Sequence, residues 1–198
     1  MNFDRIRFVS EETEIGERRE AILACTIPET IGAFRQFVRR IGKRNVTEFN
    51  YRRSDPSHAH VFVGLAVKSR EETARLVAQL REAGVETLDL SDDSLAKEHV
   101  RHMVGGHVSG VPDEIVCAFE FPERPGALTD FLEASGTRWD VTLFHYRNHG
   151  ADHGRVLAGV SVPPAERAAF RRAMKSLGYV WREVTDDPAY RLFLGNRK

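Results

Sequence analysis

The chain has 198 residues, and its 29 Lys and Arg residues balance its 29 Asp and Glu residues. A formal net charge of zero leaves no electrostatic footprint for nucleic acid or an anionic membrane surface, so neither is expected as a partner. No apolar run approaches the length of a membrane span, and the first residues contain no signal-peptide apolar block. We therefore expect a cytoplasmic protein, with Cys25 and Cys117 buried and reduced.

The sequence contains an internal repeat. Three blocks return in the same order: IPETIGAF (27–34) as FPERPGAL (121–128), VTEFNYR (46–52) as VTLFHYR (141–147), and HVFVGLAV (60–67) as RVLAGVSV (155–162). The separation stays at 94 or 95 residues, and a last pair of blocks, 101–105 and 191–195, follows a short deletion. Several matched blocks in one order indicate a module that is used twice in tandem.

In chain order, the first copy predicts a strand at 21–27, a helix through 31–41, strands at 44–53 and 59–67, a helix at 70–83 and a strand at 85–90. The second copy repeats this order, with a strand at 115–121, a helix that ends near 136, two strands, a helix at 164–177 and a strand at 179–184. Ser91 and Thr185 then suit the N-cap of one further short helix in each copy.

This order predicts an α+β fold of two tandem ferredoxin-like βαββαβ modules, each followed by a short extra helix. We place the first module at 19–105, a Gly- and Pro-containing linker at 106–113 and the second module at 114–198. Residues 1–18 belong to neither copy and are expected to be a lead-in from a missing upstream domain.

The loop between the first strand and the first helix is a candidate binding site in each copy. Free N–H groups at a helix N-terminus attract an anion such as the carboxylate of an amino acid. Gly32 and Gly126 would let a ligand approach the main chain there. The alternative is that proline and glycine simply form a strand-to-helix turn.

A tyrosine–arginine pair lies in the second strand of each copy, at 51–52 in the first and 146–147 in the second. Strand alternation puts tyrosine and arginine on opposite faces of the sheet. The tyrosines share a face with Phe49 and Phe144, which equally fits a core position with a tethered hydroxyl group. One pocket can hold both members of a pair only at a strand edge or where a bulge twists the strand.

The sequence contains no motif that is typical of a metal site or of nucleophilic catalysis. His145, His149 and His153 are interrupted by glycines, and the HxxH of His99 and His102 lacks the glutamate of a zinc motif. The chain contains no GxSxG and no phosphate-binding GxxxxGK[ST]. We therefore expect no metal site and no catalytic residues.

Several blocks are similar to the C-terminal regulatory region of biosynthetic threonine ammonia-lyase, also called threonine dehydratase. They are VTEFNYR, LSDD, HVRHMVGG, FEFPERPGALTDFL and LFHYRNHG, and the resemblance covers essentially the whole chain. It implies that both modules are ACT-like domains, a class that binds small amino-acid effectors. It also implies that this chain regulates an enzyme whose catalytic domain it does not contain.

The family enzyme converts threonine to 2-oxobutanoate and ammonia with pyridoxal phosphate, in the committed step toward isoleucine. The resemblance implies isoleucine as inhibitor and valine as its antagonist, the catalytic domain in cis, and a homo-oligomer, a tetramer in the parent enzyme. No cofactor is expected in this chain itself. Motif matching assigns the effector site to Tyr51, Tyr146, Arg147 and Arg101, and the internal repeat adds Arg52 and Arg191.

Two alternatives stay open at this point. The region could act as an assembly domain that binds no effector when isolated. It could also carry the lyase activity of the parent enzyme, which the missing pyridoxal-phosphate lysine argues against.

Overall fold

The structure, a computed structural model, describes residues 19–53, 55–102, 106, 108, 110–122, 124–135, 138–147 and 153–195. The predicted lead-in at 1–18 and part of the predicted linker lie outside the described residues, as does His149. The module bounds given above therefore stay a prediction.

Each copy folds in the predicted order. The first contains β1 (Glu20–Pro28), α2 (Ala33–Ile41), β2 (Val46–Arg52), β3 (His58–Ala66), α3 (Arg70–Glu82), β4 (Glu86–Asp89), α4 (Ser94–Glu98) and the 3-10 turn η1 (Val100–His102). The second contains β5 (Glu114–Pro122), α5 (Ala127–Ser135), β6 (Asp140–Arg147), β7 (His153–Ser161), the 3-10 turn η2 (Pro164–Glu166), α6 (Arg167–Ser176), β8 (Val180–Glu183) and α7 (Pro188–Phe193). The predicted α+β fold of two ferredoxin-like modules, each with an extra short helix, is confirmed.

The two modules share one antiparallel sheet of eight strands, in the order β4-β1-β3-β2-β6-β7-β5-β8. β2 of the first module pairs directly with β6 of the second, and Asn50 lies opposite His145 at the middle of this seam. Asn50 and His145 are also counterparts in the repeat. The seam therefore relates the two modules by an approximate twofold axis, so every residue near it has a counterpart across the seam.

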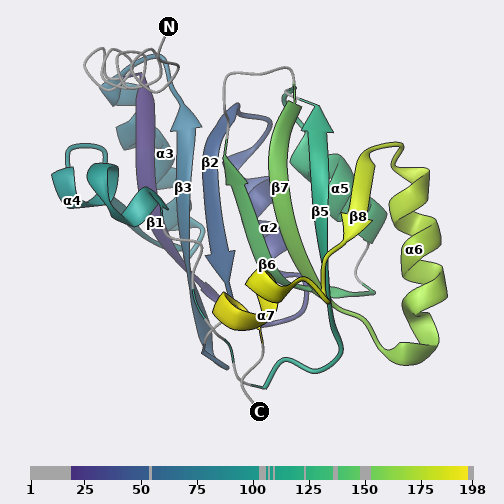
Figure 1. The fold of residues 1–198 in the computed structure, drawn as a ribbon. Coiled ribbons are helices and arrows are strands. Elements are labelled where there is room, and N and C mark those ends of the chain that lie inside the picture. The colour runs from purple at the N-terminus through teal and green to yellow at the C-terminus, as the bar shows by residue number, and fades with distance from the viewer. Residues whose placement is uncertain are drawn as a thin grey trace, which may run out of the picture.

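Helices cover both faces of the sheet. Figure 1 shows α2, α3 and α5 behind the strands, while α4 and α7 lie in front of them. The principal core spans both modules on the side of the long helices, and it includes Phe34, Phe49, Phe131 and Phe144. We call this side of the sheet the helix face and the other side the far face.

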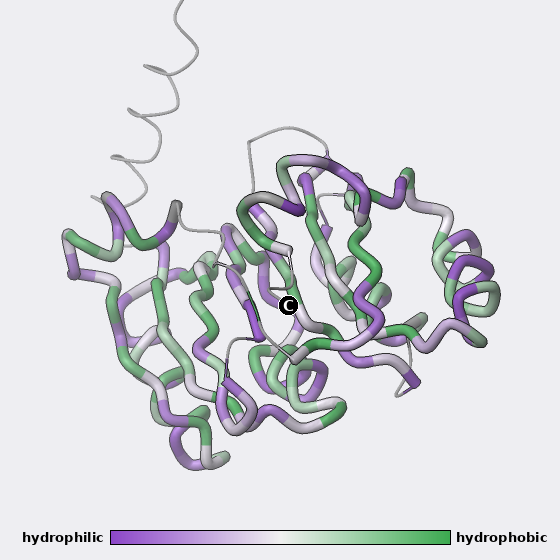
Figure 2. The backbone as a smooth tube through the Cα atoms, turned by 60° about the horizontal axis from the view of Figure 1, so that its bottom comes forward, coloured by the Kyte–Doolittle hydropathy of each residue, from purple (hydrophilic) through white to green (hydrophobic). Residues whose placement is uncertain are grey.

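The far face carries two smaller apolar clusters, one below each extra helix. Ala96 of α4 packs with Ile22 and Phe62, and Tyr190 of α7 packs with Val116 and Leu143. Figure 2 shows green, hydrophobic stretches in several strands of the sheet, whereas hydrophilic and hydrophobic residues alternate along α6 at the right edge. Burial on both faces explains why β1, β3 and β5 contain long apolar runs.

The predicted N-caps of the extra helices are wrong by two residues. Asp93 caps α4 and Asp187 caps α7, since their carboxylates accept from Ala96 N at 2.7 Å and from Ala189 N at 2.8 Å. Ser91 and Thr185 instead accept from the main-chain N–H groups of Ile22 and Val116. These hydroxyl groups thus tie the chain that leads into each extra helix to the first strand of its module.

Candidate functional site

A groove opens between the modules on the helix face, at one side of the seam. Its apolar wall is formed by α2, β2, α5 and β6, through Val38, Ile41, Val46, Leu128 and Phe144. Its polar residues are Arg44, Asn45, Arg124, Thr129 and Tyr146. A mostly apolar groove with a few converging polar groups is the usual form of a small-molecule site.

Two arginines supply positive charge at this groove. Arg44 Nε is buried, and no hydrogen-bond acceptor lies within reach of it among the described residues. Arg44 Nη2 lies 3.7 Å from Glu72 Oε1, which is a long and partly exposed ion pair. Arg124 donates to Asp130 at 2.5 Å. Arg44 therefore lines the groove and has hydrogen-bonding capacity that the described residues do not use.

The start of α5 adds to this positive end of the groove. Gly126, with φ 92°, immediately precedes the helix, and both Gly126 and Ala127 line the groove. The first turn of a helix carries N–H groups without partners in the helix and a partial positive charge. Chemically, the groove suits a carboxylate at one end and an aliphatic side chain at the other.

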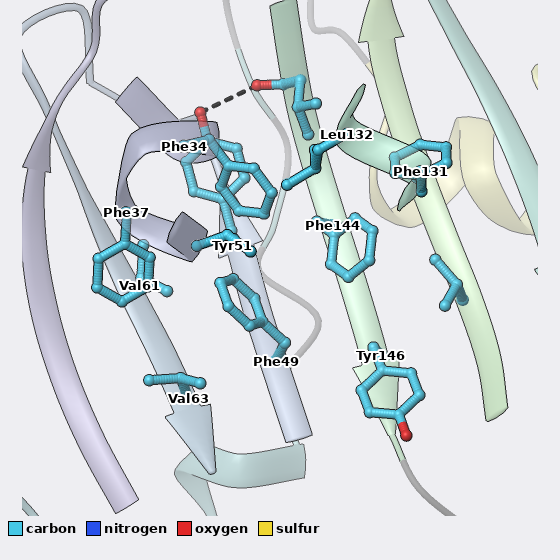
Figure 3. Packing of buried hydrophobic residues seen from close by; sticks show 14 of the residues in the cluster. Phe34, Phe37, Phe49, Tyr51, Val61, Val63, Phe131, Leu132, Phe144 and Tyr146 are labelled. Carbon is cyan, nitrogen blue, oxygen red and sulfur yellow. Dashed lines mark hydrogen bonds between the residues drawn. The ribbon is translucent and has the colours of Figure 1, made fainter. Parts of the chain in front are cut away.

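Only two of the eight predicted site residues line this groove, namely Gly126 and Tyr146. Their repeat counterparts are Gly32, which precedes α2, and Tyr51, which lies in β2 on the same face of the sheet as Tyr146 (Figure 3). Tyr51 is 4% exposed, and its ring centroid lies 4.7 Å from that of Phe34. The two tyrosines therefore occupy equivalent positions that differ in their surroundings.

The hydroxyl group of Tyr51 has hydrogen-bond acceptors within the protein. It lies 3.0 Å from Glu29 Oε1 and 3.1 Å from the carbonyl oxygen of Val141, the hydrogen bond that is dashed in Figure 3. Burial raises the pKa of the Glu29 carboxyl group, against the opposing effects of Tyr51 and Arg53. Burial and the Glu29 carboxylate also raise the pKa of Tyr51, so its hydroxyl group stays protonated.

The predicted arginines lie on the far face, separated from the tyrosines by the sheet. Arg52 forms a buried bidentate ion pair with Glu114, with Nη1–Oε1 at 2.5 Å and Nη2–Oε2 at 3.2 Å. Its Nη2 also donates to the carbonyl oxygen of Leu194 at 2.7 Å. Glu114 accepts further from Thr142 and Tyr190. This cluster ties β2 of the first module to α7 of the second.

Arg101 belongs to a similar cluster in the first module. It donates to Glu48 at 2.9 Å and lies 3.4 Å from Glu20, and both carboxylates are buried. Burial raises the pKa of Glu48 to about 6, and this effect outweighs the attraction of Arg101. Arg147 lies opposite Glu48 in the strand pairing and lowers the same pKa. Arg101 is thus already paired with carboxylates of its own chain.

Arg191 does not take the position that the repeat predicts for it. It lies on the exposed side of α7 and pairs with Asp186, whereas Arg101 is buried below the sheet. The short deletion before the last repeated block explains the difference, since it shifts these arginines relative to their helices. The structure therefore divides the predicted residues between two faces and leaves Arg191 away from both clusters.

Sequence reasoning missed Arg44, Glu29 and Glu114. The sequence did contain a signal for Glu114. Glu20 and Glu114 are repeat counterparts, and each is the first residue of a mostly apolar strand. Gly159 in the neighbouring strand was a further sign, since a Cβ atom there would lie 2.7 Å from Glu114 Oε1. Arg44 and Glu29 stand in loops, where no periodic pattern marks a functional side chain.

Metal and thiol chemistry find no support in the described part of the chain. There, no group of three or more His, Cys, Asp or Glu side chains is arranged to hold a metal ion. Cys25 and Cys117 are free and buried, as predicted, and burial raises the pKa of these thiols to about 11 and about 12. A thiol with such a pKa stays protonated and is a poor nucleophile. None of the described helices is long and apolar enough to cross a membrane.

The fold and the groove define the chain as a tandem pair of ACT-like modules joined edge to edge. The model of the family described as the C-terminal regulatory domain of threonine dehydratase matches residues 11–100 and again residues 105–194. The chain therefore belongs to this family of regulatory domains.

Curated relatives agree with this assignment. The chain is 52% identical over 194 residues to the L-threonine dehydratase biosynthetic IlvA of Burkholderia multivorans, covering 98% of this chain and 38% of the relative. It is 48% identical over 195 residues to the Escherichia coli protein of the same name, with the same coverage. It is 47% identical over 203 residues to the mitochondrial threonine dehydratase of Saccharomyces cerevisiae, covering 98% of this chain and 35% of that protein. The chain thus spans little more than a third of the relatives' length.

Proposed function

We propose that this regulatory domain senses branched-chain amino acids, with isoleucine as the inhibitor of a threonine dehydratase and valine as its antagonist. The observation that carries the proposal is the groove between the modules. It combines an apolar wall with an arginine whose buried Nε has no acceptor among the described residues. These are the two features that an aliphatic amino acid requires of its site.

In this binding mode the carboxylate of the effector accepts from Arg44 and lies near the start of α5. The aliphatic side chain packs against Val46, Leu128 and Phe144. Tyr146 lines the same groove and adds a hydroxyl group. The arginines of the far face hold the modules together in this proposal and do not contact the effector.

Isoleucine and valine differ by one methylene group, which is worth about 1–3 kcal/mol in an apolar pocket. Such a difference cannot by itself reverse the sign of regulation. The two effectors must therefore favour different conformations of the enzyme. The coupling is reciprocal, so threonine bound in the catalytic domain weakens the binding of isoleucine.

We place the pyridoxal phosphate and the conversion of threonine to 2-oxobutanoate in a catalytic domain outside this chain. A pyridoxal-phosphate enzyme holds its cofactor through a lysine Schiff base. The described residues that line the groove include no lysine, so they do not fit this cofactor. Incubating the chain with threonine and pyridoxal phosphate should give no 2-oxobutanoate, and turnover would contradict this placement.

Calorimetric titration of the chain with isoleucine, valine and glycine tests the effector proposal. We expect isoleucine and valine to bind and glycine to bind at least about tenfold more weakly, because it lacks the side chain that the apolar wall receives. Equal binding of glycine would place recognition outside the groove. An absence of binding at millimolar isoleucine would reject effector sensing by this chain.

A second candidate function is assembly of a homo-oligomer. It is favoured by the outer strands β4 and β8, where Leu88 is 58% and Val180 is 68% exposed. Exposed apolar residues on an edge strand favour pairing with another strand. Sedimentation with and without isoleucine separates the two functions, since a pure assembly domain associates equally in both conditions.

A further inference from the structure

A cavity of about 230 Å³ lies in the first module, and it shares no lining residue with the groove. It opens where β1 extends beyond its outer neighbour, since β1 begins at Glu20 but pairs with β4 only from Leu23 onward. The start of α3, the turn after β4 and the short helix α4 form its other walls (Figure 1). A space of this size holds several water molecules or one small organic molecule.

Three of the described residues that line the cavity are carboxylates, and each is already bound within the protein. Asp92 forms an ion pair with Arg70 at 2.5 Å. Asp89 accepts from the main-chain N–H group of Ser91 at 2.9 Å and from its hydroxyl group at 2.5 Å. Glu20 pairs with the buried arginine of η1 at 3.4 Å. The acidic side chains of the lining therefore do not require a cation from outside.

Two donors of the lining, in contrast, have no acceptor among the described residues. Thr73 is only 5% exposed, and its hydroxyl group forms no hydrogen bond with any of them. Lys97 is half-buried, and its ammonium group forms no ion pair within the same part of the chain. Buried polar groups in proteins are nearly always hydrogen-bonded, so an unpaired one indicates water, an ion or a ligand. The cavity thus presents one cationic and one neutral donor.

The second module pairs the corresponding charges differently. Lys97 and Arg191 each stand four residues after the N-cap of their extra helix. Arg191 forms an ion pair with Asp186. The equivalent carboxylate of the first module, Asp92, is instead bound by Arg70 from α3, which leaves Lys97 to the cavity. The lysine without an ion pair is therefore a feature of the first module and is not imposed by the repeated fold.

We propose that this cavity is a further ligand site, which takes a small carboxylate with a neighbouring neutral oxygen, as in a short 2-oxo acid. The carboxylate accepts from Lys97 and the neutral oxygen accepts from Thr73, so each donor gains one acceptor. The short aliphatic part lies against Ile22 and Ala74. An α-amino acid fits less well, because its ammonium group would need an acceptor and the carboxylates of the lining are already bound. The site goes beyond the proposed function and does not depend on it.

Calorimetric titration of the chain with three ligands of equal carbon number tests the chemistry of the site. The ligands are 2-oxobutanoate, butanoate and 2-aminobutanoate. We expect 2-oxobutanoate to bind about fivefold more tightly than butanoate, because butanoate lacks the oxygen that accepts from Thr73. We expect 2-aminobutanoate to bind more weakly than 2-oxobutanoate as well, since its ammonium group lies beside Lys97.

Two variants test the named donors. Lys97→Met should weaken 2-oxobutanoate binding about tenfold or more, which is the effect of losing a hydrogen bond from a charged group. Thr73→Val should weaken it about fivefold without lowering the free energy of unfolding, because the hydroxyl group has no described acceptor to lose. Lys175→Met, which removes an exposed lysine of α6, is the matched control and should leave the affinity unchanged. Circular dichroism melting shows that the variants fold.

The remaining outcomes overturn the proposal. No binding at millimolar 2-oxobutanoate, or unchanged affinity in Lys97→Met and Thr73→Val, rejects the site. Binding that is lost in Arg44→Met but kept in Lys97→Met would place the anion in the groove instead. Equal or tighter binding of 2-aminobutanoate rejects the ligand class. A lower stability of Thr73→Val would mean that its hydroxyl group is bound within the protein. None of these results bears on isoleucine, whose own titration decides the proposed function separately.

Discussion

The two faces of the sheet differ at the seam between the modules. On the helix face, β2 and β6 meet through aromatic side chains, with Phe49 and Phe144 at a centroid distance of 5.7 Å (Figure 3). On the far face, Arg52 of β2 forms a buried ion pair with Glu114 of β5 in the second module, and Arg101 forms buried ion pairs with Glu48 and Glu20 of its own module. Contacts between apolar groups are non-directional and can rearrange around a ligand, whereas a buried ion pair must keep its geometry. The contrast fits the proposal that an effector binds on the helix face, while the Arg52–Glu114 ion pair attaches the modules to each other on the far face.

The largest expected effect comes from removing the Glu114 carboxylate. Glu114→Ala leaves the buried guanidinium of Arg52 without its bidentate partner and should lower the free energy of unfolding by about 3–5 kcal/mol. Glu133→Ala, at the exposed pair with Arg39, should change it by less than about 1 kcal/mol. Urea unfolding measures both. Similar small losses in the two variants would contradict the rigid role of the far face.

Glu48 gives the far face a pH dependence. Its pKa in the folded protein is about 6, above the ordinary value of 4.5, so the folded state binds this proton more tightly than the unfolded state. The contribution of Glu48 to stability is therefore complete below pH 4.5 and is lost as the pH rises through about 6. Glu48→Gln imitates the protonated group and still offers an oxygen to Arg101.

We accordingly expect Glu48→Gln to flatten the stability profile in this pH window and to raise stability at pH 7 by up to about 2 kcal/mol. Urea unfolding at a series of pH values measures the effect. Glu120→Gln, at an exposed position of β5, is the control and should leave the profile unchanged. A lower stability of Glu48→Gln at pH 7 would mean that attraction to Arg101 outweighs burial.

On the helix face, Arg44→Met should weaken isoleucine binding about tenfold or more, because a hydrogen bond from a charged group contributes about 1.5–3 kcal/mol. Stability should change little, since Arg44 forms only a long, partly exposed ion pair. Arg39→Met removes an exposed arginine in the last turn of α2 and should leave the affinity unchanged. Calorimetry compares the three proteins. An unchanged affinity in Arg44→Met would move the carboxylate site to another part of the groove.

The smallest effect is expected for Arg191→Ala. Arg191 is exposed on α7 and forms an exposed ion pair with Asp186. Its removal should change the free energy of unfolding by no more than about 0.5 kcal/mol and should leave isoleucine affinity within about twofold. Thermal melting and calorimetry measure the two quantities. A clear loss of affinity would restore the effector role that the internal repeat suggests for this residue.

The amino-acid sequence by itself determined the tandem modules, the order of their strands and helices, and the placement of Tyr51 and Arg52 on opposite faces. These features depend on local periodicity and on a repeat, both of which are visible within short segments. Sequence analysis also led to Gly126 and Tyr146, because the loop and strand patterns that carry them appear in both copies.

Only the tertiary structure decided that β2 pairs with β6, that Arg52 binds Glu114 62 residues away, that a groove opens beside Tyr146, and that Tyr51 donates to Glu29. These outcomes depend on contacts between distant segments. The repeat makes the two halves alike, so no local pattern shows which contacts each tyrosine makes. The difference arises from loop residues such as Arg44 and Glu29, whose surroundings are set by the partner module across the seam.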